Sequence, residues 1–185
     1  MYLNGDAMSF LYRISTQRTA WFLLFISIVG FELTALYFEH VMKLAPCVMC
    51  IYERVAMMGV GIAALVGLMA PGNVVCRWLG FAGWGYSAFR GLQLAMEHVS
   101  YQFPDPNVLF GATCDLFVRF PEWAPLNKWA PWMFEAYGDC GKVVWQFLTL
   151  SMPQWLVVIF AAQLAVLALV VISQLFGKRE RKLFK

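Results

Sequence analysis

The chain has 185 residues, of which 61% are hydrophobic and only 14% are charged, and its formal net charge is +3. Soluble domains average about half apolar and about a quarter charged residues, so this composition argues against a soluble globular protein. A net charge this small also gives no reason to expect a nucleic-acid partner.

Four apolar stretches follow one another along the chain: residues 19–38, 51–70, 78–97 and 155–176. Each has about the 20 residues that an α-helix needs to cross a bilayer. We therefore expect an all-α membrane protein, a four-transmembrane-helix bundle in which residues 1–185 form a single integral membrane domain. The first stretch is too long for the core of a signal peptide and lacks a small-residue cleavage site after it, so we expect it to remain as an anchor.

Charge sets the expected orientation. The N-terminus, the turn around Arg77 and the tail "GKRERKLFK" are rich in basic residues, whereas the loop of residues 98–154 has more acids than bases. Basic segments stay on the cytoplasmic side of a membrane. We therefore expect both termini to be cytoplasmic, and the loops of residues 39–50 and 98–154 to lie on the outer side.

The cysteines divide unevenly between the two sides. Cys47, Cys50, Cys114 and Cys140 fall on the outer side, where disulfides persist, and Cys76 falls on the inner side as a bystander thiol. An even outer number suggests two disulfides with three possible connectivities. Structural bridges remain an alternative for Cys114 and Cys140. A four-thiolate zinc site needs two closely spaced pairs, so we expect no metal.

The stretch "APCVMCIYER" carries the clearest sign of chemistry. A bridge within a Cys-x-x-Cys pair closes too small a loop to stabilise a fold by chain entropy, so redox chemistry is the favoured use. Pro46 is expected to open the helix, whose positive end favours the thiolate form of Cys47 and Cys50. Arg54 follows on the same helical face and either serves this chemistry or anchors the helix at the interface.

Ionisable residues in the other spans suggest further roles. His98 ends the third span at the outer level, where it could donate a proton or a hydrogen bond to a bound carbonyl, or be an ordinary interfacial residue. Glu32 and Arg90 lie at matching depth in the first and third spans, so we expect them to form an ion pair.

The outer loop has three expected parts. The stretch "FPDPNVLFGATCD" is rich in turn residues and should form a mobile arm that carries Cys114. The stretch "NKWAPWMFEAYGDC" spaces Trp129 and Trp132 like one face of a helix, so we expect a short amphipathic helix on the membrane surface that tethers Cys140. The stretch "SMPQW" should begin the last span, with Ser151 as its cap.

These stretches also carry a resemblance. The sequences "FELTALYFEHVMKLAPCVMCIYER", "YSAFRGLQLAMEH", "ATCDLFVRFPEWAPLNKWAPWMFEAYGDC", "SMPQW" and "VVISQ" together cover much of the chain. In them the chain resembles the DsbB-type disulfide bond formation proteins of the bacterial inner membrane. Cys76 is an extra thiol relative to this family pattern.

The resemblance implies a fold, a place and an activity. It implies a multi-pass protein of the bacterial inner membrane with periplasmic redox loops, which re-oxidises the periplasmic thiol oxidase DsbA. By the resemblance, the DsbA thiolate would attack a Cys114–Cys140 disulfide and form a mixed disulfide with Cys114. Cys140 would then exchange with Cys47.

The same resemblance implies a cofactor. Cys50 would pass electrons to a membrane quinone, either ubiquinone or menaquinone, with Arg54 and His98 close to its ring. Two other functions stay open from the residues. One is a vitamin-K-epoxide-reductase-like enzyme with another thioredoxin-like partner, and the other is a non-catalytic membrane scaffold held by disulfides.

Overall fold

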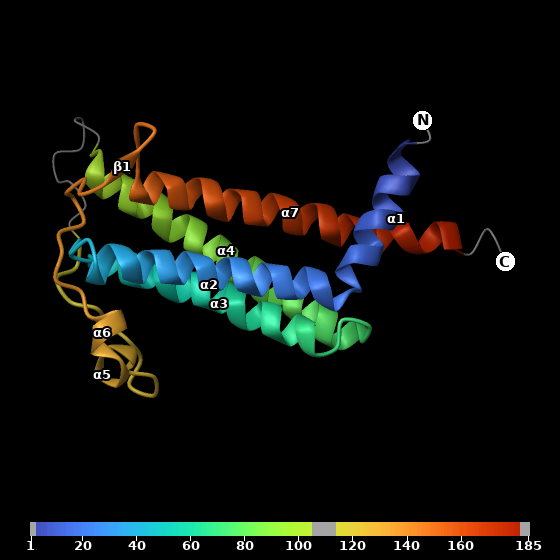
Figure 1. The fold of residues 1–185 in the computed structure, drawn as a ribbon, viewed down its shortest axis with the longest axis horizontal. Helices are drawn as coiled ribbons and strands as arrows, with labels where there is room; N and C mark the ends of the chain where they lie inside the picture. The colour runs from blue at the N-terminus through green and yellow to red at the C-terminus, as the bar shows by residue number, and fades with distance from the viewer. Residues whose placement is uncertain (1–2, 105–113, 182–185) are drawn as a thin grey trace.

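Four long helices run side by side along the molecule, and both ends of the chain lie at the same end of this bundle (Figure 1). The computed structural model describes residues 3–104 and 114–181. The long helices are α2 (Arg18–His40), α3 (Val48–Met69), α4 (Val74–Gln102) and α7 (Met152–Arg181). A shorter helix, α1 (Leu3–Ser15), crosses the bundle near the termini.

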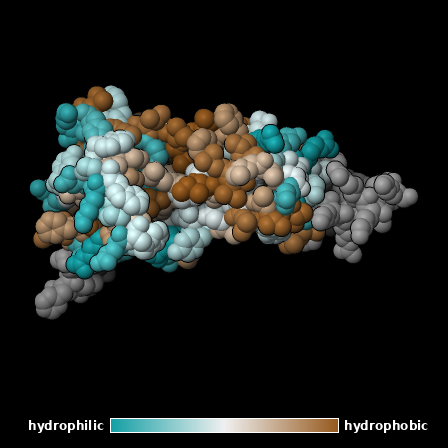
Figure 2. Space-filling view, turned by 90° about the horizontal axis from the view of Figure 1, so that it is seen from below, coloured by the Kyte–Doolittle hydropathy of each residue, from teal (hydrophilic) through white to brown (hydrophobic). Residues whose placement is uncertain are grey.

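Three helices of the described chain are long and apolar enough to cross a membrane. They are Arg18–His40, Val48–Met69 and Met152–Leu175. Figure 2 shows hydrophobic residues across the middle of the bundle and hydrophilic residues gathered toward its ends, the pattern of a protein surrounded by lipid. The chain is therefore an all-α protein of membrane character. The expected span of residues 78–97 lies within α4, which is not among the three.

Small residues let the helices approach closely. The ring of Trp21 on α2 stacks on Phe81 of α4 with centroids 5.2 Å apart. A Cβ added to Gly80 of α4 would lie 2.8 Å from this indole, and one added to Gly67 of α3 would overlap it. The hydrophobic effect does not drive helices together in lipid. Close packing, which glycines at such contacts allow, holds them together instead.

Helix α1, like the β-hairpin described below, was not predicted from the sequence. It ends at Ser15, whose carbonyl accepts a hydrogen bond from Trp21 Nε1 at 2.9 Å. The Ser15 hydroxyl accepts another from Gln174 Nε2 of α7 at 2.8 Å. These two bonds join α1 to the N-terminal end of α2 and to the C-terminal part of α7.

The expected ion pair between Glu32 and Arg90 is wrong. Arg90 is exposed on α4 and donates from Nη1 to Gln93 Oε1 at 2.8 Å. Glu32 instead faces α3, where its Oε2 lies 3.8 Å from Nε of Arg54. Depth along two helices can be estimated from the sequence, but the face on which each side chain lies depends on how the helices pack.

The outer segment between α4 and α7 differs from expectation in one respect. In place of one amphipathic helix it has two single turns, α5 (Leu126–Trp129) and α6 (Pro131–Phe134). The break falls at Ala130, which has φ −140° and ψ 71°, because the residue before a proline is disfavoured in the helical region. Residues 105–113 of the expected arm lie outside the described residues.

A β-hairpin with two residues in each strand leads into the last helix, α7. Its strands are β1 (Gln146–Phe147) and β2 (Leu150–Ser151), which pair antiparallel. Helix α7 begins directly after Ser151, as the sequence predicted. The backbone N–H of Ser151, rather than its hydroxyl, makes the capping contact, by donating to Gln154 Oε1 at 2.8 Å.

Candidate functional site

Cys47 and Cys50 sit at the N-terminal end of α3. Cys47 is the N-cap of the helix, and its Sγ accepts a hydrogen bond from the backbone N–H of Cys50 at 3.2 Å. Pro46 was expected at the first helical position but lies just before the cap, because α3 begins at Val48. Cys47 is buried, with 2% of its surface exposed, whereas Cys50 is partly exposed. Both sulfurs are free thiols.

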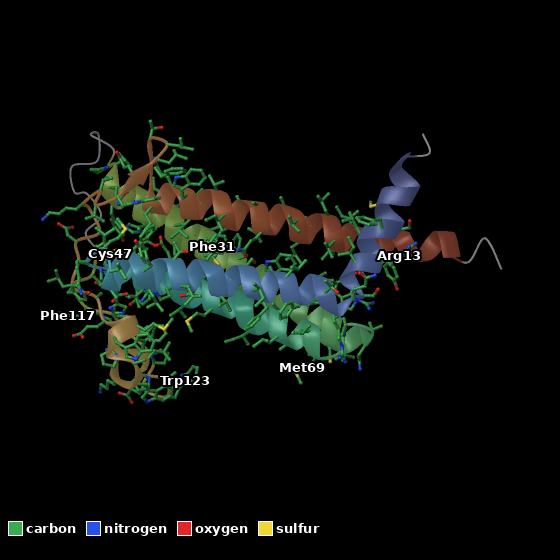
Figure 3. The ribbon with its side chains drawn as sticks, viewed as in Figure 1. Arg13, Phe31, Cys47, Met69, Phe117 and Trp123 are labelled. Atoms are coloured by element: carbon green, nitrogen blue, oxygen red, sulfur yellow. A yellow bond between two sulfur atoms is a disulfide. The ribbon has the colours of Figure 1, made fainter. Side chains whose placement is uncertain are left out.

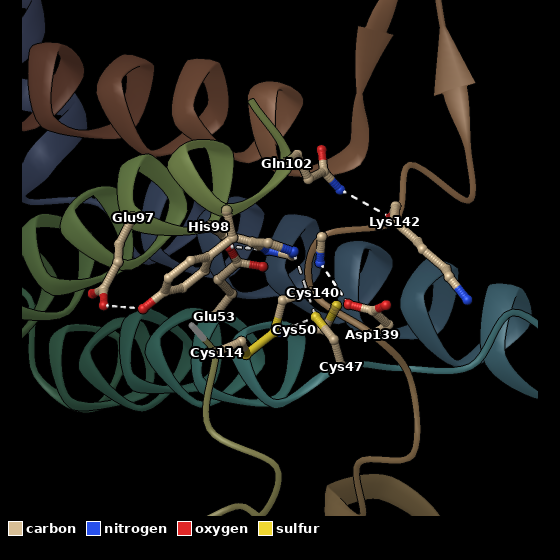
Figure 4. The surroundings of a disulfide bond; sticks show 12 residues. Cys47, Cys50, Glu53, Glu97, His98, Gln102, Cys114, Asp139, Cys140 and Lys142 are labelled. Carbon is tan, nitrogen blue, oxygen red and sulfur yellow. Dashed lines mark hydrogen bonds and ion pairs between the residues drawn. A yellow bond between two sulfur atoms is a disulfide. The ribbon is translucent and has the colours of Figure 1, made fainter. Parts of the chain in front are cut away.

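Cys114 and Cys140 form a disulfide, whereas Cys47 and Cys50 are not bonded, so the structure has one of the two disulfides that the sequence suggested. Figure 4 shows this disulfide next to the Cys47 and Cys50 side chains. Cys140 and Cys47 belong to one buried cluster with Met49, and Cys50 and Cys114 pack against it. The structure thus brings all four outer cysteines together.

A backbone contact holds Cys140 in this place. The carbonyl of Pro46 accepts hydrogen bonds from the backbone N–H groups of Tyr137, at 3.0 Å, and Gly138, at 2.9 Å. A Cβ on Gly138 would overlap the carbonyl oxygen of Ala45, so only glycine fits this close approach. The chain two residues before Cys140 is therefore fixed to the chain directly before Cys47.

A second anchor holds the chain after Cys114. The hydroxyl of Tyr52 on α3 accepts a hydrogen bond from the backbone N–H of Arg119 at 2.9 Å. The Tyr52 ring also meets Phe120 edge to face, with centroids 6.2 Å apart. Helix α3 and the residues directly before it therefore position both partners of the disulfide as well as the free pair.

His98 lies on α4 and faces the free pair. Its Nε2 is 3.5 Å from Sγ of Cys47, and its Nδ1 is 3.0 Å from Oε1 of Glu53 (Figure 4). His98 and Glu53 are each only 3% exposed. The sequence analysis did not single out Glu53. Its position could have indicated a role in the site, because a residue three positions after Cys50 lies on the same helical face as Cys50.

Arg54 is held by acids from α2 rather than by the thiols. Its Nη2 donates to Oε2 of Glu39 at 3.0 Å, and its Nη1 donates to the backbone carbonyl of Met133 in α6. Side-chain exposure of the Arg54–Glu39 pair is only 5% and 4%. Sequence reasoning missed Glu39 as well, although an acid at the outer end of an apolar span was a signal for such a partner.

A cavity of ≈ 290 Å³ opens beside Cys50 and Arg54. It lies between α2, α3 and α7 and is mostly apolar, with Phe38, Trp145 and Leu156 among its lining residues. Two polar atoms in its wall, Arg54 Nε and Glu32 Oε2, are buried without a hydrogen-bond partner among the described residues. His98 is not among the described residues that line it.

The arrangement defines a class of protein. A disulfide and a dithiol share one end of a membrane-type helical bundle, with a buried sulfur of each pair in one cluster. Such a pair of centres can exchange thiols and disulfides, because exchange needs a sulfur of one pair to reach a sulfur of the other. The chain is thus a helical protein of membrane character whose cysteine arrangement suits thiol–disulfide exchange.

Comparison with known proteins gives the family. The sequence model described as "Disulfide bond formation protein DsbB" matches residues 17–170. A disulfide bond formation protein B of Vibrio parahaemolyticus is 65% identical over 94% of this chain and 96% of its own length. Its counterpart in Vibrio cholerae is 66% identical over 91% of this chain and 95% of its own length, and that of Aeromonas salmonicida is 53% identical over 93% and 98%. The chain belongs to the DsbB family of disulfide bond formation proteins.

Proposed function

We propose that this protein oxidises a periplasmic DsbA-like thiol oxidase and passes the electrons to a membrane quinone. One observation carries the proposal. Cys140 of the disulfide and Cys47 of the dithiol lie in the same buried cluster, while Cys50 lines an apolar cavity. Membership of a disulfide bond formation family supports an oxidoreductase over a scaffold whose cysteines are only structural.

The first exchange oxidises the partner. A thiolate of the reduced partner attacks Sγ of Cys114, the Cys114–Cys140 bond breaks, and Cys140 leaves as a thiolate. The second thiol of the partner then displaces Cys114, so the partner leaves with a new disulfide. Two electrons have moved from the partner to Cys114 and Cys140.

The second exchange passes these electrons inward. Cys140 attacks Cys47 of a Cys47–Cys50 disulfide and Cys50 leaves; Cys114 then displaces Cys47 and restores the Cys114–Cys140 bond. The product has an outer disulfide and a free inner dithiol, which is the covalent state of the structure. The hydrogen bond from the Cys50 N–H and the contact with His98 fix the position of Cys47 Sγ for this step.

The cavity residues fit a quinone. Apolar side chains suit its ring. The buried Nε–H of Arg54, which makes no hydrogen bond within the described part of the chain, is a donor suited to a carbonyl oxygen. A bound quinone, ubiquinone or menaquinone, would supply the acceptor for two electrons and two protons of the Cys47–Cys50 dithiol. DsbA is a strong oxidant at about −120 mV, so an acceptor of still higher potential is required.

A second cavity supports a lipid-soluble acceptor. It measures ≈ 410 Å³ and shares Phe31 and Ile159 with the first. Figure 3 shows Phe31 between the outer end, marked by Cys47, and the inner end, marked by Arg13. The two cavities together offer an apolar path along α2 and α7 for an isoprenoid chain.

The same proposal includes four membrane spans in the bacterial inner membrane. Helix α4 has 29 residues and lies between α3 and α7, so it would cross together with them. Both termini would be cytoplasmic and the cysteine-bearing end periplasmic. Trp129 and Trp132 are 66% and 58% exposed, which suits side chains that rest at the membrane surface.

The test is quinone reduction by the purified full chain with a reduced DsbA as electron donor. We expect turnover with the unchanged protein and with Cys76→Ser, whose thiol lies outside the cysteine cluster. Cys114→Ser and Cys50→Ser should each abolish turnover. Unchanged turnover in either variant would contradict the proposal, and oxidation of another thioredoxin-like protein in place of DsbA would reassign the partner.

A further inference from the structure

Three side chains that bind soft metals converge at the outer end of α3. The sulfurs of Cys47 and Cys50 and a ring nitrogen of His98 all lie within 4.8 Å of one another. Sγ of Cys47 and Nε2 of His98 are 3.5 Å apart. In a tetrahedral zinc site, bond lengths of about 2.3 Å to sulfur and about 2.0 Å to nitrogen put these two ligand atoms about 3.5 Å apart. The observed spacing therefore needs little adjustment to hold the ion.

The surroundings of His98 supply a second, independent observation. Oε1 of Glu53 lies 3.0 Å from Nδ1 of His98, and both side chains are 3% exposed. Histidines that bind zinc almost always donate their other ring N–H to a carboxylate or carbonyl, which leaves the remaining nitrogen free for the metal. Glu53 thus directs the free nitrogen of His98 toward Cys47.

The cysteine pair has the matching features. The Cys50 N–H donates to Sγ of Cys47, a contact that suits a sulfur carrying negative charge. Cys50 lines the cavity of ≈ 290 Å³, so a fourth coordination position on that side can be filled by water. This site differs from a four-cysteine site, because Cys114 and Cys140 are joined in a disulfide.

We propose that the reduced Cys47–Cys50 pair and His98 form a binding site for zinc or a similar soft divalent cation, with Glu53 as the residue that positions His98. Binding releases the two thiol protons and changes no oxidation state. The site exists only while the pair is reduced, since a Cys47–Cys50 disulfide offers no thiolate. A bound ion would withhold both sulfurs from thiol–disulfide exchange.

The test uses Co²⁺ as a spectroscopic probe and Zn²⁺ as its competitor. The full chain carrying Cys76→Ser, Cys114→Ser and Cys140→Ser is reduced with a phosphine in detergent micelles and freed of reductant without oxygen. We expect one equivalent of Co²⁺ to give the visible absorption of a tetrahedral site with sulfur ligands, and Zn²⁺ to displace it. After oxidation of the pair the absorption should be absent.

Single variants in this background assign the ligands. Cys47→Ser or Cys50→Ser should abolish the absorption, and His98→Gln should weaken Co²⁺ binding more than tenfold. Glu53→Gln should weaken it about 10- to 100-fold, as loss of an outer partner does. His40→Gln is the matched control, since His40 is the other of the two histidines and lies at the end of α2, and it should change nothing.

Some of these variants could fail to fold, so a second measurement uses the chain without substitutions. In the reduced natural chain, Zn²⁺ should slow alkylation of Cys47 and Cys50 but not of Cys76, as read by mass spectrometry of the peptides. The proposal is overturned if the oxidised chain binds Co²⁺ equally well, if His98→Gln binds as tightly as its parent, or if Zn²⁺ fails to protect the pair. None of these outcomes depends on quinone reduction.

Discussion

At the residue scale, the buried charges around Arg54 are the feature with the largest expected effect on stability. Its Nη2 donates to Oε2 of Glu39 at 3.0 Å, and its Nε lies 3.8 Å from Oε2 of Glu32. Both carboxylates come from α2, so the arginine joins α2 to α3. A buried charge that loses its partner keeps its full desolvation cost, which makes such a pair sensitive to removal of either member.

Glu39→Ala should lower the free energy of unfolding by about 3 kcal/mol, because Arg54 would remain buried with only the more distant Glu32 as an acid partner. The measurement is unfolding of the purified protein in mixed detergent micelles, followed by circular dichroism. Arg90→Ala is the control, since Arg90 is exposed and its side chain bonds Gln93. We expect a change of less than about 0.5 kcal/mol there. Equal effects of the two substitutions would contradict the role given to Glu39.

Gly138 is the second residue at which the structure predicts the effect of a substitution. In Gly138→Ala, the new Cβ would displace the chain from the Ala45 carbonyl and shift Cys140 away from Cys47. A misplacement of about 1 Å at reacting groups can cost about 100-fold in rate, so we expect turnover to fall by about 10- to 100-fold. The measurement is quinone reduction with reduced DsbA.

The matched control for this change is Gly30→Ala on α2. A Cβ added at Gly30 meets nothing within 4 Å, so the substitution should leave turnover unchanged. In Gly138→Ala the Cys114–Cys140 disulfide should still form, because Gly138 contacts the chain before Cys47 and not Cys114. Full turnover in Gly138→Ala would show that the Pro46 contact does not position Cys140.

At the scale of elements, the contact between α4 and α7 depends on a glycine facing an aromatic ring. A Cβ on Gly91 of α4 would overlap the ring of Phe160 of α7, which is fully buried. Helices in lipid associate through such close packing, so added volume at the contact separates them.

Gly91→Ala should therefore lower the free energy of unfolding by about 1–3 kcal/mol, the usual cost of overpacking. The double variant Gly91→Ala with Phe160→Leu should lose less stability than the sum of the two single changes, because the smaller side chain makes room for the new methyl group. Thermal unfolding in detergent measures all three proteins. Additive losses would show that Gly91 and Phe160 do not share this contact.

At the scale of the whole molecule, the four clustered cysteines and the chain termini lie at opposite ends of the bundle. Figure 1 shows both termini at one end, and Figure 3 shows Cys47 at the other. Cys76 lies in the first turn of α4, which follows the turn between α3 and α4 at the end of the bundle where the termini lie. The proposed orientation therefore separates Cys76 from the other cysteines by the thickness of the membrane.

This separation can be measured with a membrane-impermeant maleimide on intact spheroplasts. After reduction, we expect Cys114 to be labelled, and Cys76 to be labelled only once the membrane is permeabilised. A variant with Cys76 as its sole cysteine is the control for reagent entry. Labelling of Cys76 in intact spheroplasts would reverse the proposed orientation.

The sequence by itself determined the helical membrane character and which four cysteines share one end of the bundle. Long apolar runs and the distribution of charge fix these properties locally, because each span must bury its own backbone in lipid. The helix starts near Cys47 and Ser151 were also within one or two residues of the structure. Helix α1, the hairpin of β1 and β2 and the break before Pro131 were not foreseen. Helix α1 is held by hydrogen bonds with Trp21 of α2 and with Gln174 of α7.

Only the tertiary structure decided which partner each ionisable side chain takes. Glu32 and Glu39 meet Arg54, Glu53 meets His98, and His98 meets Cys47. Each of these contacts joins two helices, and the face that a helix presents to its neighbour follows from packing around Trp21 and Gly91 and not from the local pattern of residues. The place of Cys140 beside Cys47 likewise depends on the Pro46–Gly138 contact between segments far apart in the chain.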